Sequence, residues 1–237
     1  MTRRRWIADE VCGNRAFLVG ARADHLVRVL RGRVGQEFDI ATGNEVRRGL
    51  LTAISADRVE FELGERIAVS QDVRITLLLS IFKFDRMEWA IEKCTELGVA
   101  RIVPVIARRT EAHLAAAAAK RVDRWRRIVL QASEQSRRSL VPEVCQPLKL
   151  KEASTLPASV RIVLSELETE VRLKDALQSL SNGGDVVIAL GPEGGWTNEE
   201  LTIFSELGWS SASLGRTILR AETAAIAAIS IVQSELS

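Results

Sequence analysis

Histidine and cysteine are scarce in this sequence of 237 residues, and their scarcity limits the chemistry that the chain can perform. The two histidines, His25 and His113, are too few for catalytic centres or metal sites that need several imidazoles. The three cysteines, Cys12, Cys94 and Cys145, lie far apart without a Cys-x-x-Cys pair. That spacing excludes a cysteine zinc finger and argues against a disulfide framework. Isolated thiols fit a reducing cytoplasm, and no metal site is expected.

Long apolar segments are also missing. No run of about 18 apolar residues occurs, so no transmembrane helix is expected. The first six residues, Met1–Trp6, include three arginines with no apolar segment behind them, so no secretory signal is expected. With 46% hydrophobic and 27% charged residues, the composition is that of a globular protein. We therefore expect a cytoplasmic protein with one large domain or two modest ones.

The positive charge is spread unevenly, although the formal net charge is only +2. Residues 1–70 hold 12 arginines against 10 carboxylates, and residues 120–151 hold nine basic against three acidic side chains. Arginine supplies 27 of the 33 basic residues, and its planar guanidinium suits phosphate groups. Two basic segments on a near-neutral chain are typical of a nucleic-acid footprint. Solvated helix faces in an arginine-rich proteome would give the same pattern.

The first 70 residues have the pattern of short β-strands separated by turns. Partly alternating apolar residues predict strands over residues 15–19, 37–40, 49–54 and 59–63. Glycine, Asn and Asp between these runs supply the turns. Helical spacing occurs once, from Asp24 to Leu30. The pattern predicts a small β-barrel-like module.

After about residue 72, apolar strands alternate with amphipathic helices. Because each strand is almost wholly apolar, the pattern indicates a parallel sheet with helices on both faces. In such sheets ligands bind beyond the carboxyl ends of the strands, so the loops after Leu164, Leu190 and Leu214 are the expected site. The predicted strands are 73–79, 101–106, 160–164, 185–190 and 212–214, and the predicted helices are 85–97, 114–136, 173–180, the stretch from a Thr197–Glu200 capping box to Gly208, and 222–236.

Two of these loops contain unusual segments. Gly191-Pro192-Glu193-Gly194-Gly195 has three glycines in five residues, which lets the backbone approach a ligand closely, but it matches neither a P-loop nor a GxGxxG fingerprint. The stretch from Leu214 to Ala224 places a glycine after a strand, and an Arg and a Glu at the start of a helix. Taken singly, a tight turn and a helix N-terminus that favours an acidic residue are adequate explanations.

Together the two segments are far more specific. Gly-Pro-Glu-Gly-Gly followed about twenty residues later by Leu-Gly-x-x-Ile-Leu-Arg-x-Glu-Thr-Ala resembles the SPOUT-class methyltransferases, and more narrowly the ribosomal RNA small subunit methyltransferase E family. Residues 86–99 also resemble this family. So do residues 134–138, with Arg137 where glycine is usual, and residues 24–31, where His-His is commoner than Asp24-His25. The likeness spans nearly the whole chain.

The resemblance implies a fold and a reaction. It implies a PUA-like RNA-binding β-barrel over residues 1–70, and an α/β SPOUT domain over residues 73–237 with a deep trefoil knot near residues 186–230. It also implies a homodimer that uses S-adenosylmethionine to methylate N3 of a uridine in 16S rRNA within the small ribosomal subunit. The residues expected to bind the cofactor are Leu164, Gly191, Glu193, Gly194, Leu214, Gly215, Ile218 and Leu219.

Uracil N3 must lose its proton when it is methylated, which requires a base or stabilisation of the uracil anion. On the resemblance, Arg220 is the candidate for electrostatic stabilisation, and ion pairing within the fold is its alternative role. Glu222 is the candidate that orients Arg220 or accepts the proton, and a helix N-terminal charge is its alternative role.

Contacts to RNA are expected from four residues. A solvated surface position is the alternative for Arg138, and a helix-capping role is the alternative for His25. Two further functions stay open on the sequence. One is a SPOUT methyltransferase that acts on another RNA, such as a tRNA, and the other is a catalytically silent RNA-binding or ribosome-assembly protein. The four candidate RNA-binding residues are His25, Arg28, Arg31 and Arg138.

Overall fold

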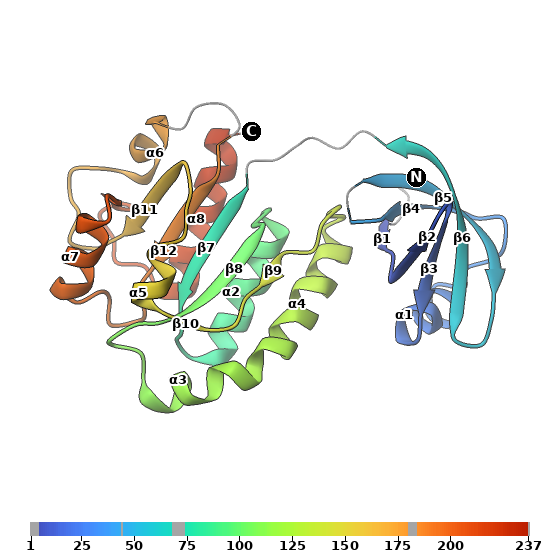
Figure 1. Cartoon of the computed structure of the whole chain (residues 1–237), viewed down its shortest axis with the longest axis horizontal. Helices are drawn as coiled ribbons and strands as arrows, with labels where there is room; N and C mark the ends of the chain where they lie inside the picture. Colours follow the sequence, from blue (N-terminus) through green and yellow to red (C-terminus); the bar gives the residue numbers. More distant parts are fainter. Residues whose placement is uncertain (1–4, 44, 68–73, 180–183, 237) are drawn as a thin grey trace. The chain divides into compact units, whose positions relative to one another are not determined.

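The computed structural model describes residues 5–43, 45–67, 74–179 and 184–236 (Figure 1). Contacts divide the chain into two compact units, one of residues 1–71 and 133–141 and one of residues 72–132 and 142–237. The first unit is built on a mainly antiparallel sheet and the second on a parallel sheet. Within the described residues, no helix combines the length and the apolar character needed to cross a membrane.

A six-stranded sheet forms the first unit, with the strand order β1-β4-β5-β6-β3-β2. Neighbouring strands are antiparallel except β1 and β4, which are parallel. β1 and β2 stand at the two ends of this order, so the described pairings form a curled, open sheet (Figure 1). The strands are β1 (Arg5–Ile7), β2 (Glu10–Cys12), β3 (Arg15–Val19), β4 (Glu37–Ala41), β5 (Val46–Ile54) and β6 (Arg58–Ile67).

The core of the first unit lies between this sheet and one short helical segment. The helix predicted from Asp24 to Leu30 begins earlier, as α1 (Ala21–Asp24), and continues as a π-helix over His25–Val29. Strands β4 and β5 approach closely at Gly49, where a Cβ atom would lie 2.3 Å from the Ile40 side chain. The large, fully buried side chains of this core are Trp6, Leu18, Leu26, Ile40, Leu51 and Phe61.

Residues 133–141 belong to the first unit by their contacts. Arg22 donates hydrogen bonds to the carboxylate of Asp9 and, at 2.8 Å, to that of Glu134. Arg137 has a φ of +59°, a conformation that glycine adopts without strain and other residues rarely adopt. That backbone geometry accounts for the glycine that is usual at this position in the family that the sequence resembles.

Seven parallel strands form the sheet of the second unit, in the order β10-β8-β7-β12-β11-β13 with β9 paired to β8. The predicted parallel sheet is thereby confirmed. β12 lies between β7 and β11, although it follows β11 in the chain. Because neighbours are parallel, the strands' carboxyl ends share one edge. The strands are β7 (Ile75–Ser80), β8 (Arg101–Ile106), β9 (Glu143–Val144), β10 (Leu148–Lys149), β11 (Val160–Leu164), β12 (Val186–Leu190) and β13 (Ser210–Ala212).

Helices flank this parallel sheet (Figure 1). On one face, Val103 and Val187 of the strands pack with Leu150 of α5 and Phe204 of α7. Alternate strand residues such as Ile188 point to the opposite face, where α8 contacts both β12 and α2. The helices are α2 (Phe84–Glu96), α3 (Ala112–Ala118), α4 (Val122–Gln135), α5 (Leu150–Ala153), α6 (Leu173–Ala176), α7 (Asn198–Glu206) and α8 (Ala221–Leu236).

The ends of some elements differ from the sequence-based expectation. The strand predicted over residues 212–214 is instead Ser210–Ala212, because Ser213 makes only an isolated bridge and the chain then turns. β1 and β2 were not predicted from the sequence, because three residues are too few to show alternation of apolar and polar side chains. Val73 and Leu180, at the ends of two predicted elements, lie outside the described residues.

Candidate functional site

A cavity of about 380 Å³ lies at the carboxyl edge of the parallel sheet. Three segments that follow strands line it: residues 164–167 after β11, most of residues 190–196 after β12, and residues 213–221 after β13. Arg86 of α2 and Ala224 of α8 complete the lining. Small-molecule sites commonly measure about 300–1,000 Å³, so the cavity has room for a compact ligand.

The segment after β12 is a tight turn that leads into α7. Gly195 has a φ of +69°, and its N–H donates to the Pro192 carbonyl at 2.8 Å. The predicted capping box is present: the Thr197 hydroxyl accepts from the Glu200 N–H at 3.3 Å, and the Glu200 carboxylate accepts from the Thr197 N–H at 2.9 Å. The other Glu200 oxygen accepts from the Arg108 backbone N–H at 2.7 Å. The start of α7 is therefore fixed, and the turn with it.

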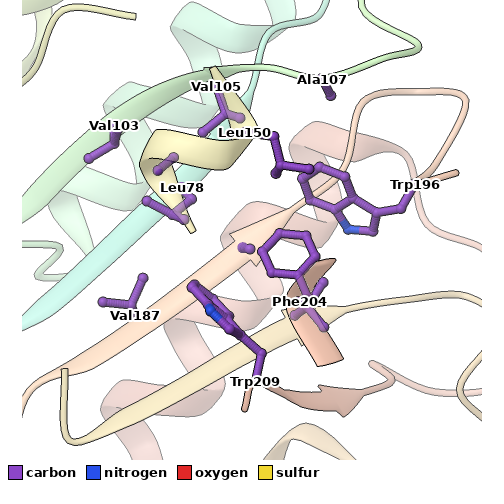
Figure 2. Close-up of a cluster of buried hydrophobic side chains, with 12 residues drawn as sticks. Leu78, Val103, Val105, Ala107, Leu150, Val187, Trp196, Phe204 and Trp209 are labelled. Atoms are coloured by element: carbon purple, nitrogen blue, oxygen red, sulfur yellow. The ribbon is translucent and has the colours of Figure 1, made fainter. Parts of the chain in front are cut away.

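Trp196 connects this turn to the neighbouring strand. Its indole N–H donates to the carbonyl oxygen of Leu164, the last residue of β11, at 3.0 Å. The Trp196 ring packs edge-on against Phe204 with centroids 5.1 Å apart, and Phe204 packs in turn against Trp209 (Figure 2). A Cβ atom at Gly191 would lie 3.3 Å from the indole, so the ring fills the space behind that glycine. Trp196 thus fixes two of the three segments that line the cavity.

Two arginines hold the same turn, and the sequence alone gave neither a role in the site. Arg86 Nη1 lies 3.1 Å from a Glu193 carboxylate oxygen, and Arg86 Nε lies 3.8 Å from Glu222 Oε1. Arg109 donates to the Gly194 carbonyl. A signal for Arg86 existed, because it begins one of the segments that resemble a known family. Arg109 lies in the loop after β8, where no pattern marks it.

Glu222 is a buried carboxylate beside the cavity, in the first turn of α8. Its side chain is only 7% exposed, and its one ion-pair partner among the described residues is Arg86. Oε2 has no hydrogen-bond partner there. A buried carboxylate oxygen without a donor is costly, and a ligand that supplies an N–H or O–H would satisfy it.

The segment after β13 is far more exposed than the turn after β12. Gly215 has a φ of +141°, and a Cβ atom there would lie 3.5 Å from Arg172 Nη1. Ile218 is 85% exposed although it lines the cavity. Arg216 and Arg220 are also exposed and form no ion pair within the described part of the chain. This segment contributes one wall of the cavity with few contacts of its own.

The structure gathers the predicted cofactor-binding residues at this one cavity, with a single exception. Gly194 belongs to the same turn but does not line the cavity, and its carbonyl is taken by Arg109. Arg220 lines the cavity, and Glu222 lies next to it in α8. The predicted cofactor-binding residues in the lining are Leu164, Gly191, Glu193, Leu214, Gly215, Ile218 and Leu219.

The predicted RNA-binding residues lie in the first unit. His25 and Arg28 are exposed on the π-helix, and Arg31 is exposed just after it. Arg28 Nε lies 3.3 Å from the Asp24 carboxylate, with most of the arginine side chain in solvent. Arg138 is partly buried in the segment 133–141.

Known proteins resemble this chain in sequence and in fold. Residues 69–233 match the RNA methyltransferase domain family. Ribosomal RNA small subunit methyltransferase E of Mesomycoplasma hyopneumoniae is 33% identical over 153 residues, which cover 65% of this chain and 66% of that protein, just under two thirds of its length. The protein of the same name from Aquifex aeolicus is 32% identical over 238 residues, which cover 96% and 97% of the two chains. A crystal structure of ribosomal RNA small subunit methyltransferase E from Neisseria gonorrhoeae bound to S-adenosyl methionine is similar with a TM-score of 0.84 and 32% identity, over 98% of both chains.

Proposed function

The chain belongs to the RNA methyltransferase family and, within it, to the ribosomal RNA small subunit methyltransferase E proteins, and on that premise we propose that it transfers a methyl group from S-adenosylmethionine to N3 of a uridine in 16S rRNA. The observation that carries the proposal is the cavity at the sheet edge. Three strand-end segments line this cavity, Arg220 is one of the lining residues, and Glu222 follows in the first turn of α8. The relatives' names and the S-adenosyl methionine bound to the Neisseria gonorrhoeae protein support the reaction class.

The lining of the cavity suits S-adenosylmethionine. Leu164, Leu214 and Leu219 offer apolar contact to an adenine ring, and the backbone around Gly191 offers amides and carbonyls to its edge. When bound, S-adenosylmethionine supplies a methyl group activated by the positive sulfonium sulfur. The proposed binding residues are Leu164, Gly191, Glu193, Gly194, Leu214, Gly215, Ile218 and Leu219, of which Gly194 acts through the shape of the turn.

Glu222 and Arg220 are proposed to serve the target base. In the transfer, a bond forms from uracil N3 to the methyl carbon, the carbon–sulfur bond breaks with its electron pair left on sulfur, and the N3 proton leaves. Glu222 is the proposed proton acceptor because its Oε2 lacks a donor in the described protein and Arg86 orients the carboxylate. Arg220 is proposed to stabilise the negative charge that develops on the uracil oxygens.

The first unit is proposed to bind RNA through His25, Arg28, Arg31 and Arg138. The finer features that the family resemblance implies belong to the same proposal: a PUA-like barrel over residues 1–70, a SPOUT domain over residues 73–237, and a deep trefoil knot near residues 186–230. A homodimer acting on the small ribosomal subunit in the cytoplasm completes the proposal.

Methyl transfer to small ribosomal subunits that lack this modification tests the proposal directly. The subunits are incubated with labelled S-adenosylmethionine, and their nucleosides are analysed by mass spectrometry. We expect N3-methyluridine with the wild-type protein. Arg220→Ala should lower the rate about 10²–10³-fold, as removal of one oxyanion-stabilising donor does. Glu222→Gln should lower it about 10²–10⁴-fold, as loss of a general base does.

Two matched variants control for charge. Arg74→Ala removes an exposed arginine next to the amino end of β7, at the opposite edge of the sheet, and Glu206→Gln removes an exposed carboxylate at the end of α7. Both should methylate at the wild-type rate. Transfer to tRNA but not to subunits would reject the substrate, and cofactor binding without transfer to either RNA would favour a silent RNA-binding protein.

A further inference from the structure

Three arginines that form no ion pair within the described residues lie at the cavity or beside one of its lining segments. Arg216 and Arg220 line the cavity, and Arg172 Nη1 would lie 3.5 Å from a Cβ atom placed on Gly215. All three side chains are exposed, and within the described residues none has a hydrogen-bonded or charged partner. By contrast, Arg86 in the same unit is paired with two carboxylates. Arginines without acidic partners are thus gathered on one rim.

Of the acidic residues near this rim, Glu168 and Glu193 are engaged elsewhere, and Glu166 forms no ion pair with Arg172 or Arg216 within the described residues. The backbone N–H groups of Val171 and Glu170 donate to the Glu168 carboxylate at 3.1 and 2.9 Å, and they lower the pKa of Glu168. Glu193 is paired with Arg86. Glu166 lines the cavity beside the turn after β12, where a Cβ atom on Gly195 would lie 2.5 Å from its carboxylate. The positive charge of Arg172 and Arg216 is therefore left for a ligand.

The backbone around Arg172 is fixed although its guanidinium is unpaired. The Ser213 N–H donates to the Val171 carbonyl at 2.9 Å, and the Leu173 N–H donates to the Ser213 carbonyl at 3.0 Å. Arg172 and Ser213 form a parallel bridge that continues the edge of the sheet. This ladder brings Arg172 to Gly215, directly before Arg216, so that two guanidiniums are carried on adjoining segments.

We propose that Arg172 and Arg216 form a phosphate-binding pair that holds the RNA backbone next to the target uridine. The inference rests on the proposed function and extends it to residues that neither motif assigns. A base that enters the cavity brings its flanking phosphates to the rim, and exposed guanidiniums bind phosphate through paired N–H groups. The carboxylate of S-adenosylmethionine is the other anion that could meet these arginines, so the experiment measures both ligands.

The test compares affinities for unmethylated small ribosomal subunits over a series of salt concentrations. Each lost phosphate contact should reduce the slope of log affinity against log salt by about 0.7–0.9. Arg172→Ala and Arg216→Ala should each show that reduction, and the double variant should bind RNA roughly tenfold more weakly or worse. Arg74→Ala is the matched control and should leave the slope unchanged. Arg172→Lys/Arg216→Lys should keep the slope while losing affinity, because lysine keeps the charge without the planar fork.

Affinity for S-adenosylmethionine, measured by calorimetry without RNA, separates the outcomes. The inference predicts an unchanged cofactor affinity in the double variant. A weakened cofactor affinity with an unchanged salt slope would assign the pair to the cofactor carboxylate and overturn the inference. A wild-type protein that methylates subunits while the double variant keeps the full slope would also overturn it. If the wild-type protein neither binds nor methylates subunits, the proposed function fails, and this inference fails with it.

Discussion

Two segments that line the same cavity are built in opposite ways. Three side-chain contacts hold the turn after β12: Arg109 binds the Gly194 carbonyl, Arg86 binds Glu193, and the Trp196 indole binds the Leu164 carbonyl. The segment after β13 has few such contacts. Its Ile218 is 85% exposed, and its arginines have no partner in the described residues.

We expect the turn after β12 and the segment after β13 to contribute to ligand binding in different ways. A turn held by these contacts presents its backbone in one arrangement before any ligand arrives, which lowers the ordering cost of binding. An exposed segment with unpaired charge gains its contacts only when a ligand supplies them. Substitutions in the turn should therefore change folding stability first, and substitutions in the exposed segment should change binding with little effect on stability.

The largest effect is expected at Trp196. Trp196→Ala removes a buried ring from the core and should lower the free energy of unfolding by about 3–5 kcal/mol. Trp196→Phe keeps most of the packing against Phe204 and loses only the hydrogen bond to Leu164, which contributes about 1 kcal/mol. Urea unfolding measures both losses. Calorimetry with S-adenosylmethionine should show weaker binding for Trp196→Phe, because the turn is released from β11.

A second tryptophan provides the control for that experiment. Trp89 on α2 is 48% exposed, so Trp89→Ala should cost well under half of the loss seen at Trp196. If Trp196→Ala and Trp89→Ala lowered the free energy of unfolding equally, the buried contacts of Trp196 would add nothing to stability. That result would contradict the conclusion that Trp196 fixes the turn.

An intermediate effect is expected at Arg86. Arg86→Gln leaves the buried Glu222 carboxylate without its cation and should cost about 1–2 kcal/mol, a value reduced because the Arg86 side chain is 34% exposed. Glu222→Gln in the same chain should recover most of that loss, because the uncompensated charge is then gone. A double-mutant cycle in urea measures this coupling.

An exposed ion pair in the first unit serves as the reference for this double-mutant cycle. Arg15 and Glu60 lie 3.1 Å apart with the arginine side chain 65% exposed, and Arg15→Gln should cost under about 1 kcal/mol. If Arg86→Gln costs no more than Arg15→Gln and shows no coupling to Glu222, the turn does not depend on this ion pair.

The local motifs of the site could be predicted from the sequence, but the long-range contacts that support them could not. The capping box of Thr197 and Glu200 and the apolar strands were predictable because their patterns are contiguous in the chain. Apart from Leu164, the residues proposed to bind the cofactor were predicted from two local motifs. The supporting contacts were not, because Trp196 reaches Leu164 across 32 positions and Arg86 reaches Glu193 across 107. Such pairs depend on the strand order, in which β12 lies between β7 and β11, and periodicity carries no information about that order.

The smallest change in stability is expected at Ile218, on the exposed wall. Ile218→Ser should alter the free energy of unfolding by less than about 0.5 kcal/mol, because the side chain is 85% exposed. It should still weaken S-adenosylmethionine binding roughly tenfold, because a bound ligand would cover this apolar surface. Val34→Ser, at an apolar side chain 59% exposed in the first unit, should change neither quantity. A loss of stability at Ile218 comparable to that of Trp196→Phe would show that both walls are fixed in advance, and the contrast between them would disappear.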